Sequence, residues 1–249
     1  MRLDGKVVVV TGAARGIGRG IVERVVEEGA AVVIGDLLEV EGAETVARIE
    51  RAGGQASFRR TDVTVPSDLD ALVALAESTY GKLDVVVPNA GIAVAGDVEQ
   101  LTVDDCRRLF DVNVIGTWLT CKQALPALRR NGGGSIVITA SAAATRPLPQ
   151  SGLYGPTKAA IVMLMRNLAL TAAKDHIRCN AVAPGPIVTD LYHFTDEQEQ
   201  AFVDRWTPQV PAGFLGTPWD VANVVVFLAS DEARWVTGSV YPVDGGFAC

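Results

Sequence analysis

The sequence predicts an α/β fold, a single doubly wound domain with about seven parallel strands and helices on both faces of the sheet. Short, nearly continuous apolar runs alternate with longer amphipathic segments, as expected of parallel strands buried on both faces. The first run, at residues 6–12, leads into a glycine-rich turn and then a helical pattern. The chain has 249 residues, of which 49% are hydrophobic and 20% charged, which suits one large domain spanning residues 1–249.

Each expected strand is an apolar, β-branched run, and each expected helix is a longer stretch with apolar residues at helical spacing. We expect strands at residues 6–12, 31–36, 56–63, 83–91, 134–141, 177–185 and 239–246. We expect helices at residues 16–28, 40–52, 67–81, 102–129, about 154–174 and 218–230. Pro156 falls in the first turn of the helix that begins near residues 151–154, where a missing N–H costs little.

The least regular stretch lies at about residues 190–217. It contains the aromatic residues Tyr192, Phe194 and Trp206, together with His193 and several prolines. A long irregular stretch inside a compact domain is often a lid or a binding loop, and the plainer alternative is a surface excursion with a small core of its own. We expect a substrate-binding lid here, with His193 as a candidate substrate contact.

Composition excludes several classes of protein. A net charge of −7 argues against a nucleic-acid partner, which would favour a basic face. No apolar run reaches the roughly 18 residues of a spanning helix, and the first run is interpreted as a strand rather than a signal peptide. The four cysteines, at positions 106, 121, 179 and 249, are scattered, so we expect no metal site, no disulfide framework and no membrane association, and a cytoplasmic location.

The segment TGAARGIG, at residues 11–18, opens the first expected helix with three glycines, Gly12, Gly16 and Gly18. Small residues let a backbone approach a pyrophosphate, and a helix N-terminus supplies free N–H groups and a favourable dipole. The spacing differs from the G-x-G-x-x-G fingerprint, but the position between the first strand and the first helix favours a dinucleotide site.

Asp36 ends the second expected strand, where a dinucleotide-binding fold places an acid against the ribose hydroxyls. A carboxylate there disfavours a 2′-phosphate, because a like-charge pair at about 4 Å costs on the order of 4 kcal/mol at an effective dielectric near 20. Leu37 follows and offers no compensating charge, although Arg15 in the glycine turn could compensate in part. The sequence therefore predicts NAD as cofactor in preference to NADP.

These motifs together resemble the classical short-chain dehydrogenases/reductases, a family with a Rossmann-type fold, and the resemblance covers essentially the whole chain. Pro88 departs from the pattern, since the family commonly has a second asparagine there, but a proline is tolerable at a strand end. The matching motifs, in order, are TGAARGIG, Asp36, Asp62–Val63, NAG at 89–91, Asn113, Ser141, YGPTK at 154–158, PGPIVT at 184–189 and VDGG at 243–246.

The resemblance implies which residues hold the cofactor. Asp62 and Val63 would frame the adenine, the turn Asn89–Gly91 would line the adenosine side, and Thr189 would hold the nicotinamide carboxamide. The complete implied set is Gly12, Arg15, Gly16, Ile17, Gly18, Asp36, Leu37, Asp62, Val63, Asn89, Ala90, Gly91, Tyr154, Lys158, Pro184, Gly185, Ile187 and Thr189.

The resemblance also implies a catalytic tetrad, Asn113, Ser141, Tyr154 and Lys158. A free tyrosine has a pKa of about 10, and a nearby cation favours the phenolate, so Lys158 one helical turn on would make Tyr154 a usable base in oxidation or acid in reduction. Ser141 would hydrogen-bond the substrate oxygen, and Asn113 would bind a water that links Lys158 to solvent. The plain alternatives are a turn serine and an exposed or capping asparagine.

The expected substrate is a small secondary alcohol or the matching ketone. Ala143 and Leu148 suggest an apolar wall, while Arg146 is expected to be a solvated surface residue rather than an anion site. The substrate-binding residues are expected to be Ser141, Ala143, Gln150, Tyr154 and His193. The resemblance implies a homotetramer or dimer. Two alternatives stay open, a 3-oxoacyl-carrier-protein reductase using NADPH and a non-catalytic NAD-binding sensor or scaffold.

Overall fold

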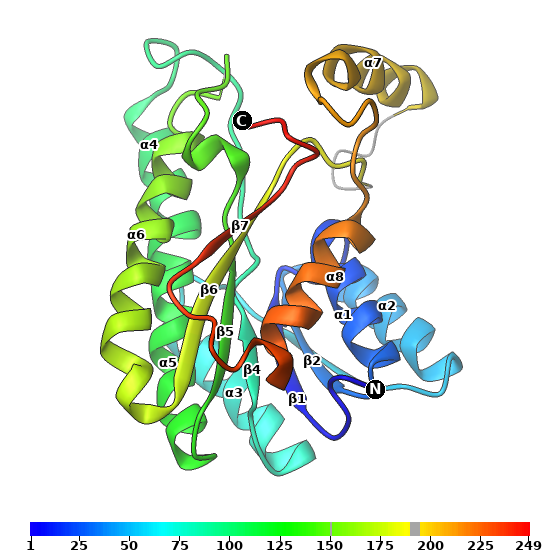
Figure 1. Ribbon diagram of the computed structural model, residues 1–249, viewed down its shortest axis with the longest axis vertical. Helices are drawn as coiled ribbons and strands as arrows, with labels where there is room; N and C mark the ends of the chain where they lie inside the picture. Colours follow the sequence, from blue (N-terminus) through cyan, green and yellow to red (C-terminus); the bar gives the residue numbers. More distant parts are fainter. Residues whose placement is uncertain (150, 190–194) are drawn as a thin grey trace.

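The computed structural model describes residues 1–149, 151–189 and 195–249 (Figure 1). Within them, seven strands form one parallel sheet in the order β3-β2-β1-β4-β5-β6-β7. The strands are β1 (Val7–Thr11), β2 (Ala31–Asp36), β3 (Gln55–Arg60), β4 (Val85–Val87), β5 (Gly134–Thr139), β6 (Ile177–Pro184) and β7 (Val240–Val243). The predicted fold class is confirmed.

Helices lie on both faces of this sheet (Figure 1). They are α1 (Gly16–Glu27), α2 (Glu39–Arg51), α3 (Pro66–Tyr80), α4 (Val103–Phe110), α5 (Thr117–Arg130), α6 (Tyr154–Ala172), α7 (Asp196–Trp206) and α8 (Pro218–Ala229). Single turns are η1 (Asp111–Gly116), η2 (Ala142–Ala144), η3 (Ala173–Asp175), η5 (Thr207–Gln209) and η6 (Asp231–Ala233). Among the helices that the structure describes, none is long and apolar enough to cross a membrane.

Strand β1 shows why its sequence is continuously apolar. Val7 and Val9 belong to the core cluster that α3, α5 and α6 form on one face of the sheet. Val8 and Val10 belong to the cluster that α1 and α8 form on the opposite face. Successive side chains of a strand point to opposite faces, so a strand covered on both sides buries every residue.

The strand order places the turn after β1 beside the turn after β4. Strand β1 pairs with β2 on one side and with β4 on the other, so the direction of winding reverses between β1 and β4. A Cβ atom on Gly12 would lie only 2.6 Å from the Cα atom of Ala90, so the two turns are in close contact. Open α/β sheets bind ligands at such a switch point, outside the carboxyl ends of the strands.

The helix predicted at residues 102–129 is interrupted by η1, a turn of π-helix between α4 and α5. The turn contains Asn113, whose carbonyl oxygen accepts a hydrogen bond from Thr117 Oγ1 at 2.7 Å. A π-turn inserts one extra residue into the helical repeat, and such turns are frequent at functional sites. Periodicity over 28 residues cannot reveal one inserted residue, so the uninterrupted helix was a wrong prediction.

The irregular stretch predicted at residues 190–217 contains a regular helix, α7. Figure 1 shows this helix standing apart from the helices that cover the sheet. Its start is a capping box, in which Thr195 Oγ1 accepts from Gln198 N at 3.3 Å and the Gln198 side chain accepts from Thr195 N at 3.0 Å. The helix is mostly polar, which hid its periodicity. Tyr192, His193 and Phe194 lie outside the described residues.

Candidate active site

Helix α6 brings the predicted tyrosine and lysine together. It begins at Tyr154, whose N–H donates to Ser151 O at 2.8 Å. Pro156 is the third residue of the helix, where the backbone has no intrahelical N–H partner to lose. Lys158 Nζ lies 5.6 Å from the centre of the Tyr154 ring, one turn along the same helix. The proline is therefore compatible with the pair.

Lys158 is almost completely buried, with 4% of its surface exposed. Its Nζ donates to Thr139 O, the last carbonyl of β5, at 3.0 Å. Burial lowers the pKa of the Lys158 ammonium from 10.5 to about 8, because desolvation disfavours the charged form. A buried lysine close to a tyrosine at the carboxyl end of the sheet is the kind of perturbed group that marks functional sites.

Asn113 is fully buried, which rules out the alternative of an exposed asparagine. Its Nδ2 donates to Ile92 O at 2.9 Å and to Thr157 Oγ1 at 3.1 Å, while its Oδ1 accepts from Ile92 N at 2.8 Å. A Cβ atom on Gly91 would lie 3.2 Å from Asn113 Oδ1 and 3.3 Å from Lys158 Nζ. Asn113 therefore ties the turn after β4 to α6, next to the buried lysine.

Ser141 follows β5 and begins the turn η2. Its Oγ accepts a hydrogen bond from Ala143 N at 3.1 Å, so the serine is indeed a turn residue. The turn packs against the start of α6, because a Cβ atom on Gly155 would lie 2.8 Å from Ala143 O. Ser141 therefore stands on a turn that is fixed to the helix bearing Tyr154.

The glycine turn forms a cradle that side chains would fill. Gly12 has a φ of 66°, and a Cβ atom on Gly18 would lie 2.1 Å from Gly12 O. Asn89, just after the neighbouring strand β4, holds this turn in place: its Nδ2 donates to Gly12 O at 2.8 Å and to Thr11 O at 3.1 Å. The turn sits at the N-terminus of α1, where free backbone N–H groups and the helix dipole favour an anion.

Asp36 lies at the same turn, as its position after β2 predicts. Its Oδ2 accepts from Ala14 N at 2.9 Å, and its Oδ1 accepts from Leu38 N at 3.1 Å. Arg60 on β3 lies opposite Asp36 in the strand register, and its Nε is 3.6 Å from Glu39 Oε1. No local pattern in the sequence reveals this basic neighbour, because only the pairing of β2 with β3 brings Arg60 opposite Asp36.

Asp62 and Val63, expected against the adenine, are held in place by local contacts. Asp62 Oδ1 accepts from Thr64 N at 2.9 Å and from Thr64 Oγ1 at 2.6 Å. Val63 is buried, and its Cγ2 would lie 2.6 Å from a Cβ atom on Gly116. The pair lies just after β3, at the carboxyl end of the sheet.

The segment at residues 184–189, at the end of β6, runs between strand β7 and the residues that precede α8. Gly185 N donates to Val243 O of β7 at 3.0 Å, and Val188 N donates to Gly216 O, just before α8, at 3.0 Å. The side chain of Ile187 is buried in the core with α1 and α8. Thr189 is thereby placed at the carboxyl end of the sheet, where the other predicted cofactor residues gather.

The predicted substrate side is only partly within the described residues. Ala143 is buried, and Leu148 packs on a small apolar cluster around Phe247. Arg146 is not the solvated residue expected from the sequence: its guanidinium donates to Phe247 O and lies 4.0 Å over the centre of the Phe247 ring. The partner is 101 residues away in sequence, so no local pattern signals it. Gln150 and His193 lie outside the described residues.

Three threonines support the site and were not singled out from the sequence. Thr11 Oγ1 accepts from Asn89 N at 3.1 Å, and the carbonyl of Thr139 accepts from Lys158. Thr157 Oγ1 donates to Tyr154 O at 2.7 Å and accepts from Asn113 Nδ2. Of the three, only Thr157 could have been found from the sequence, because it lies inside the YGPTK motif.

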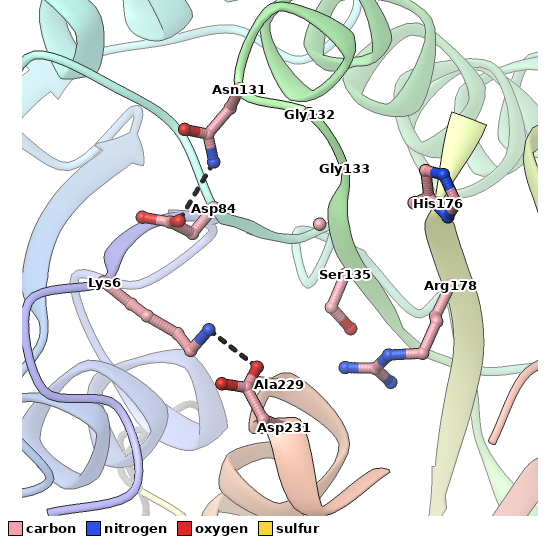
Figure 2. A pocket seen from close by; sticks show the side chains of 11 residues that line it. Lys6, Asp84, Asn131, Gly132, Gly133, Ser135, His176, Arg178, Ala229 and Asp231 are labelled. Atoms are coloured by element: carbon pink, nitrogen blue, oxygen red, sulfur yellow. Dashed lines mark hydrogen bonds and ion pairs between the residues drawn. The ribbon is translucent and has the colours of Figure 1, made fainter. Parts of the chain in front are cut away.

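A polar cleft of about 210 Å³ lies at the opposite edge of the sheet. It is lined at the amino ends of β1, β4, β5 and β6, among others by Lys6, Asp84, Asn131 and Arg178. Figure 2 shows Lys6 reaching Asp231 and Asn131 reaching Asp84, at 2.9 and 3.0 Å respectively. The predicted site lies at the carboxyl ends, so this cleft is separate from it.

Comparison with known proteins finds relatives that match almost the whole chain. A family model described as enoyl-(acyl carrier protein) reductase matches residues 12–248. A 3beta-hydroxysteroid dehydrogenase of Eggerthella lenta is 39% identical over 248 residues, which cover 98% of this chain and 94% of that protein. Similar solved structures include a short-chain type dehydrogenase/reductase from Mycobacterium marinum, at a TM-score of 0.92 and 32% identity, covering 99% of this chain and 97% of that one.

A second solved structure is similar over the whole chain. It is a 3-ketoacyl-(acyl-carrier-protein) reductase from Brucella melitensis complexed with NADH, at a TM-score of 0.92 and 32% identity, and the match covers 99% of this chain and 100% of that one. The chain therefore belongs to the classical short-chain dehydrogenases/reductases, oxidoreductases that exchange a hydride between a nicotinamide cofactor and an alcohol or ketone.

Proposed function

We propose that this chain is an NAD-preferring dehydrogenase/reductase in which Tyr154 moves the proton of a secondary alcohol or the matching ketone. The observation that carries the proposal is the arrangement on α6, with Lys158 buried one turn from Tyr154 and 5.6 Å from its ring centre. A panel of secondary alcohols with NAD⁺, and of ketones with NADH, tests it by the absorbance of NADH.

The glycine turn, Asp36 and Thr189 would hold the cofactor, which when bound supplies hydride exchange with the substrate carbon. Tyr154 takes the proton of the substrate hydroxyl during oxidation and returns it during reduction. Lys158 favours the phenolate form of Tyr154 through its positive charge, and it would also hydrogen-bond the ribose that carries the nicotinamide. Asn113 fixes the turn after β4 against α6 and, in this proposal, also holds the water that connects Lys158 to solvent.

Ser141 is suited to donate a hydrogen bond to the substrate oxygen. Its Oγ already accepts from Ala143 N at 3.1 Å, so a lone pair is used in the turn and the hydroxyl proton points elsewhere. A donor held in advance where negative charge develops stabilises the transition state more than the ground state. Ala143, Gln150 and His193 complete the proposed substrate side.

Cofactor preference should change when the charge of Asp36 is removed. In Asp36→Ala, the ratio of kcat/KM with NADH to that with NADPH should fall about tenfold or more, because a like-charge repulsion on the order of 4 kcal/mol before screening is lost. Asp36→Asn keeps an acceptor for Ala14 N and should shift the ratio in the same direction. Asp62→Asn is the control, because its proposed contact is to the adenine that both cofactors share. An unchanged ratio in Asp36→Ala would contradict the NAD preference.

The stability of the cofactor-free protein should depend on pH through Lys158. Burial lowers its pKa to about 8, so between pH 8 and 10.5 the folded protein binds fewer protons than the unfolded chain, and the free energy of unfolding rises with pH. Below pH 8 the buried charge lowers the free energy of unfolding by up to about 3 kcal/mol. Lys158→Met should therefore be more stable than wild type in urea at pH 7, with the difference shrinking towards pH 10.5. A pH-independent difference would refute this account of the burial.

A second candidate function is reduction of a 3-oxoacyl group on a carrier protein. The similarity to the Brucella melitensis reductase supports it. The net charge of −7 argues against docking of an acidic carrier. Turnover of a 3-oxoacyl-carrier protein that exceeded turnover of every free ketone would favour this function over the first.

We further propose a homotetramer or dimer in the cytoplasm. Large apolar side chains are exposed on the run from α4 to α5, including Val103 at 66%, Ile115 at 42% and Trp118 at 41%. Met163 and Leu170 on α6 are exposed at 55% and 80%. Apolar surface of this kind is typical of subunit interfaces, and sedimentation velocity measures the association state directly.

A further inference from the structure

We propose that Arg146 and Phe247 form a latch that fastens the C-terminal tail, residues 244–249, to the turn η2 and thereby positions Ser141 and Tyr154. Both latch residues would be positioning residues, since neither is assigned a contact with the reacting atoms. The catalytic consequence of the latch rests on the proposed function, whereas its structural consequence does not.

The tail is a compact turn that holds Phe247 in one place. The carboxylate of Asp244 accepts from Gly246 N and from Ala248 N, each at 3.0 Å. Phe247 N donates to Asp244 O at 3.0 Å, and the Phe247 ring is 2% exposed. An aromatic ring buried this completely on a short turn needs partners outside its own segment, because so few residues cannot cover it.

Arg146 contributes two contacts to that burial. Its guanidinium donates to the carbonyl of Phe247 and also lies 4.0 Å over the centre of the ring. A planar guanidinium can stack on a ring and hydrogen-bond at its edge, and a lysine cannot do both. The latch is therefore specific for arginine.

The tail also contacts the segment that bears α7. The rings of Trp206 and Phe247 meet edge to face, with their centres 5.8 Å apart and their planes at 70°. Val210 is buried in the same cluster, and Ala212 N donates to Gly245 O at 3.0 Å. The tail thus joins the end of α7 to the turn after β5.

One turn connects the latch to the reacting groups. Arg146 N donates to Ala142 O at 2.9 Å, and Ala142 packs in the cluster with Phe247. The neighbouring Ser141 begins that same turn, and Gly155, next to Tyr154, packs against its Ala143 carbonyl. A shift of the tail would therefore reach both Ser141 and Tyr154 through η2.

Loss of the latch should lower kcat more than it raises KM. In Phe247→Ala and Arg146→Met, kcat/KM should fall about tenfold to a hundredfold, because a misplacement of about 1 Å can cost that much when reacting groups must be aligned. Phe247→Tyr keeps the ring and should restore most of the activity. Arg146→Lys keeps the positive charge but loses the planar guanidinium that stacks on the ring, and it should not restore the activity.

Arg130→Met is the matched control. Arg130 ends α5 and its Nη2 lies 2.8 Å from Glu77 Oε1, so the substitution also exchanges an arginine for a methionine but removes an ion pair that involves neither the tail nor the proposed site. It should leave kcat near the wild-type value. Hydrogen exchange of residues 142–149 and 196–209, measured by mass spectrometry on the full-length protein, gives a readout that needs no substrate. Exchange should be faster in both latch variants and unchanged in Arg130→Met.

Wild-type kcat together with unchanged exchange in both latch variants would overturn the proposal, and so would an equal loss of kcat in Arg130→Met. If Phe247→Ala failed to fold, Arg146→Met and Phe247→Leu would decide, since both keep apolar volume at the cluster. If the wild-type protein turned over no alcohol or ketone, the proposed function would fail, while the exchange experiment would still decide whether the latch holds η2.

Discussion

Tyr154→Phe should reduce kcat by about 10³-fold or more, because the phenol oxygen is the proposed carrier of the substrate proton and general acid–base catalysis contributes on this scale. The substitution removes one oxygen atom and keeps the ring, so α6 and the neighbouring Lys158 should stay in place. NADH binding, measured by quenching of protein fluorescence, should remain close to that of the wild type. The same result would exclude a sensor or scaffold role that never used the tyrosine.

Tyr80→Phe is the matched control for that experiment. Its hydroxyl pairs with Ser57 Oγ at 3.0 Å, at the junction of α3 and β3 and away from the proposed site. This variant should keep the kcat of the wild type. Equal kcat values for Tyr154→Phe and the wild type would remove Tyr154 as the proton carrier.

Lys158→Met should lose both turnover and cofactor affinity. The ammonium is proposed to favour the Tyr154 phenolate and to hydrogen-bond the nicotinamide ribose, so kcat/KM should fall by about 10²- to 10⁴-fold and the Kd for NADH should rise. Methionine keeps the length and the apolar stem of the side chain. The variant should combine lower activity with higher stability at pH 7, which is the trade expected when a buried charge is kept for function.

Lys174→Met is the control for the lysine variant, because Lys174 is exposed in the turn η3 after the same helix. It should keep the kcat of the wild type, and it should change the free energy of unfolding by no more than about 0.5 kcal/mol. A Lys158→Met protein that bound NADH as tightly as the wild type would contradict the proposed contact with the ribose.

The parts of this molecule that the sequence predicted well depend on local patterns. The run of valines at residues 7–10 is buried on both faces and could only be a central parallel strand. Gly12 and Gly18 sit where a side chain has no room, and Tyr154 and Lys158 are one turn apart on α6. In each case the spacing in sequence fixes the spacing in space.

The parts that were missed depend on contacts between distant segments. Arg146 meets Phe247 across 101 residues, and Arg60 comes beside Asp36 only because β3 pairs with β2. The π-turn around Asn113 adds a single residue to an amphipathic helical pattern, and periodicity cannot resolve one added residue. Helix α7 has a readable capping box at Thr195, but its polar composition suggested a loop.

The central claim is that the Tyr154–Lys158 pair carries out alcohol–ketone exchange with NAD. Its most direct test is the absorbance of NADH when the wild-type protein and Tyr154→Phe are each mixed with NAD⁺ and a panel of secondary alcohols, and with NADH and the matching ketones. The account predicts turnover of at least one pair by the wild-type protein and a near-complete loss in the variant. Folded wild-type protein that bound NADH and turned over nothing in either direction would contradict it.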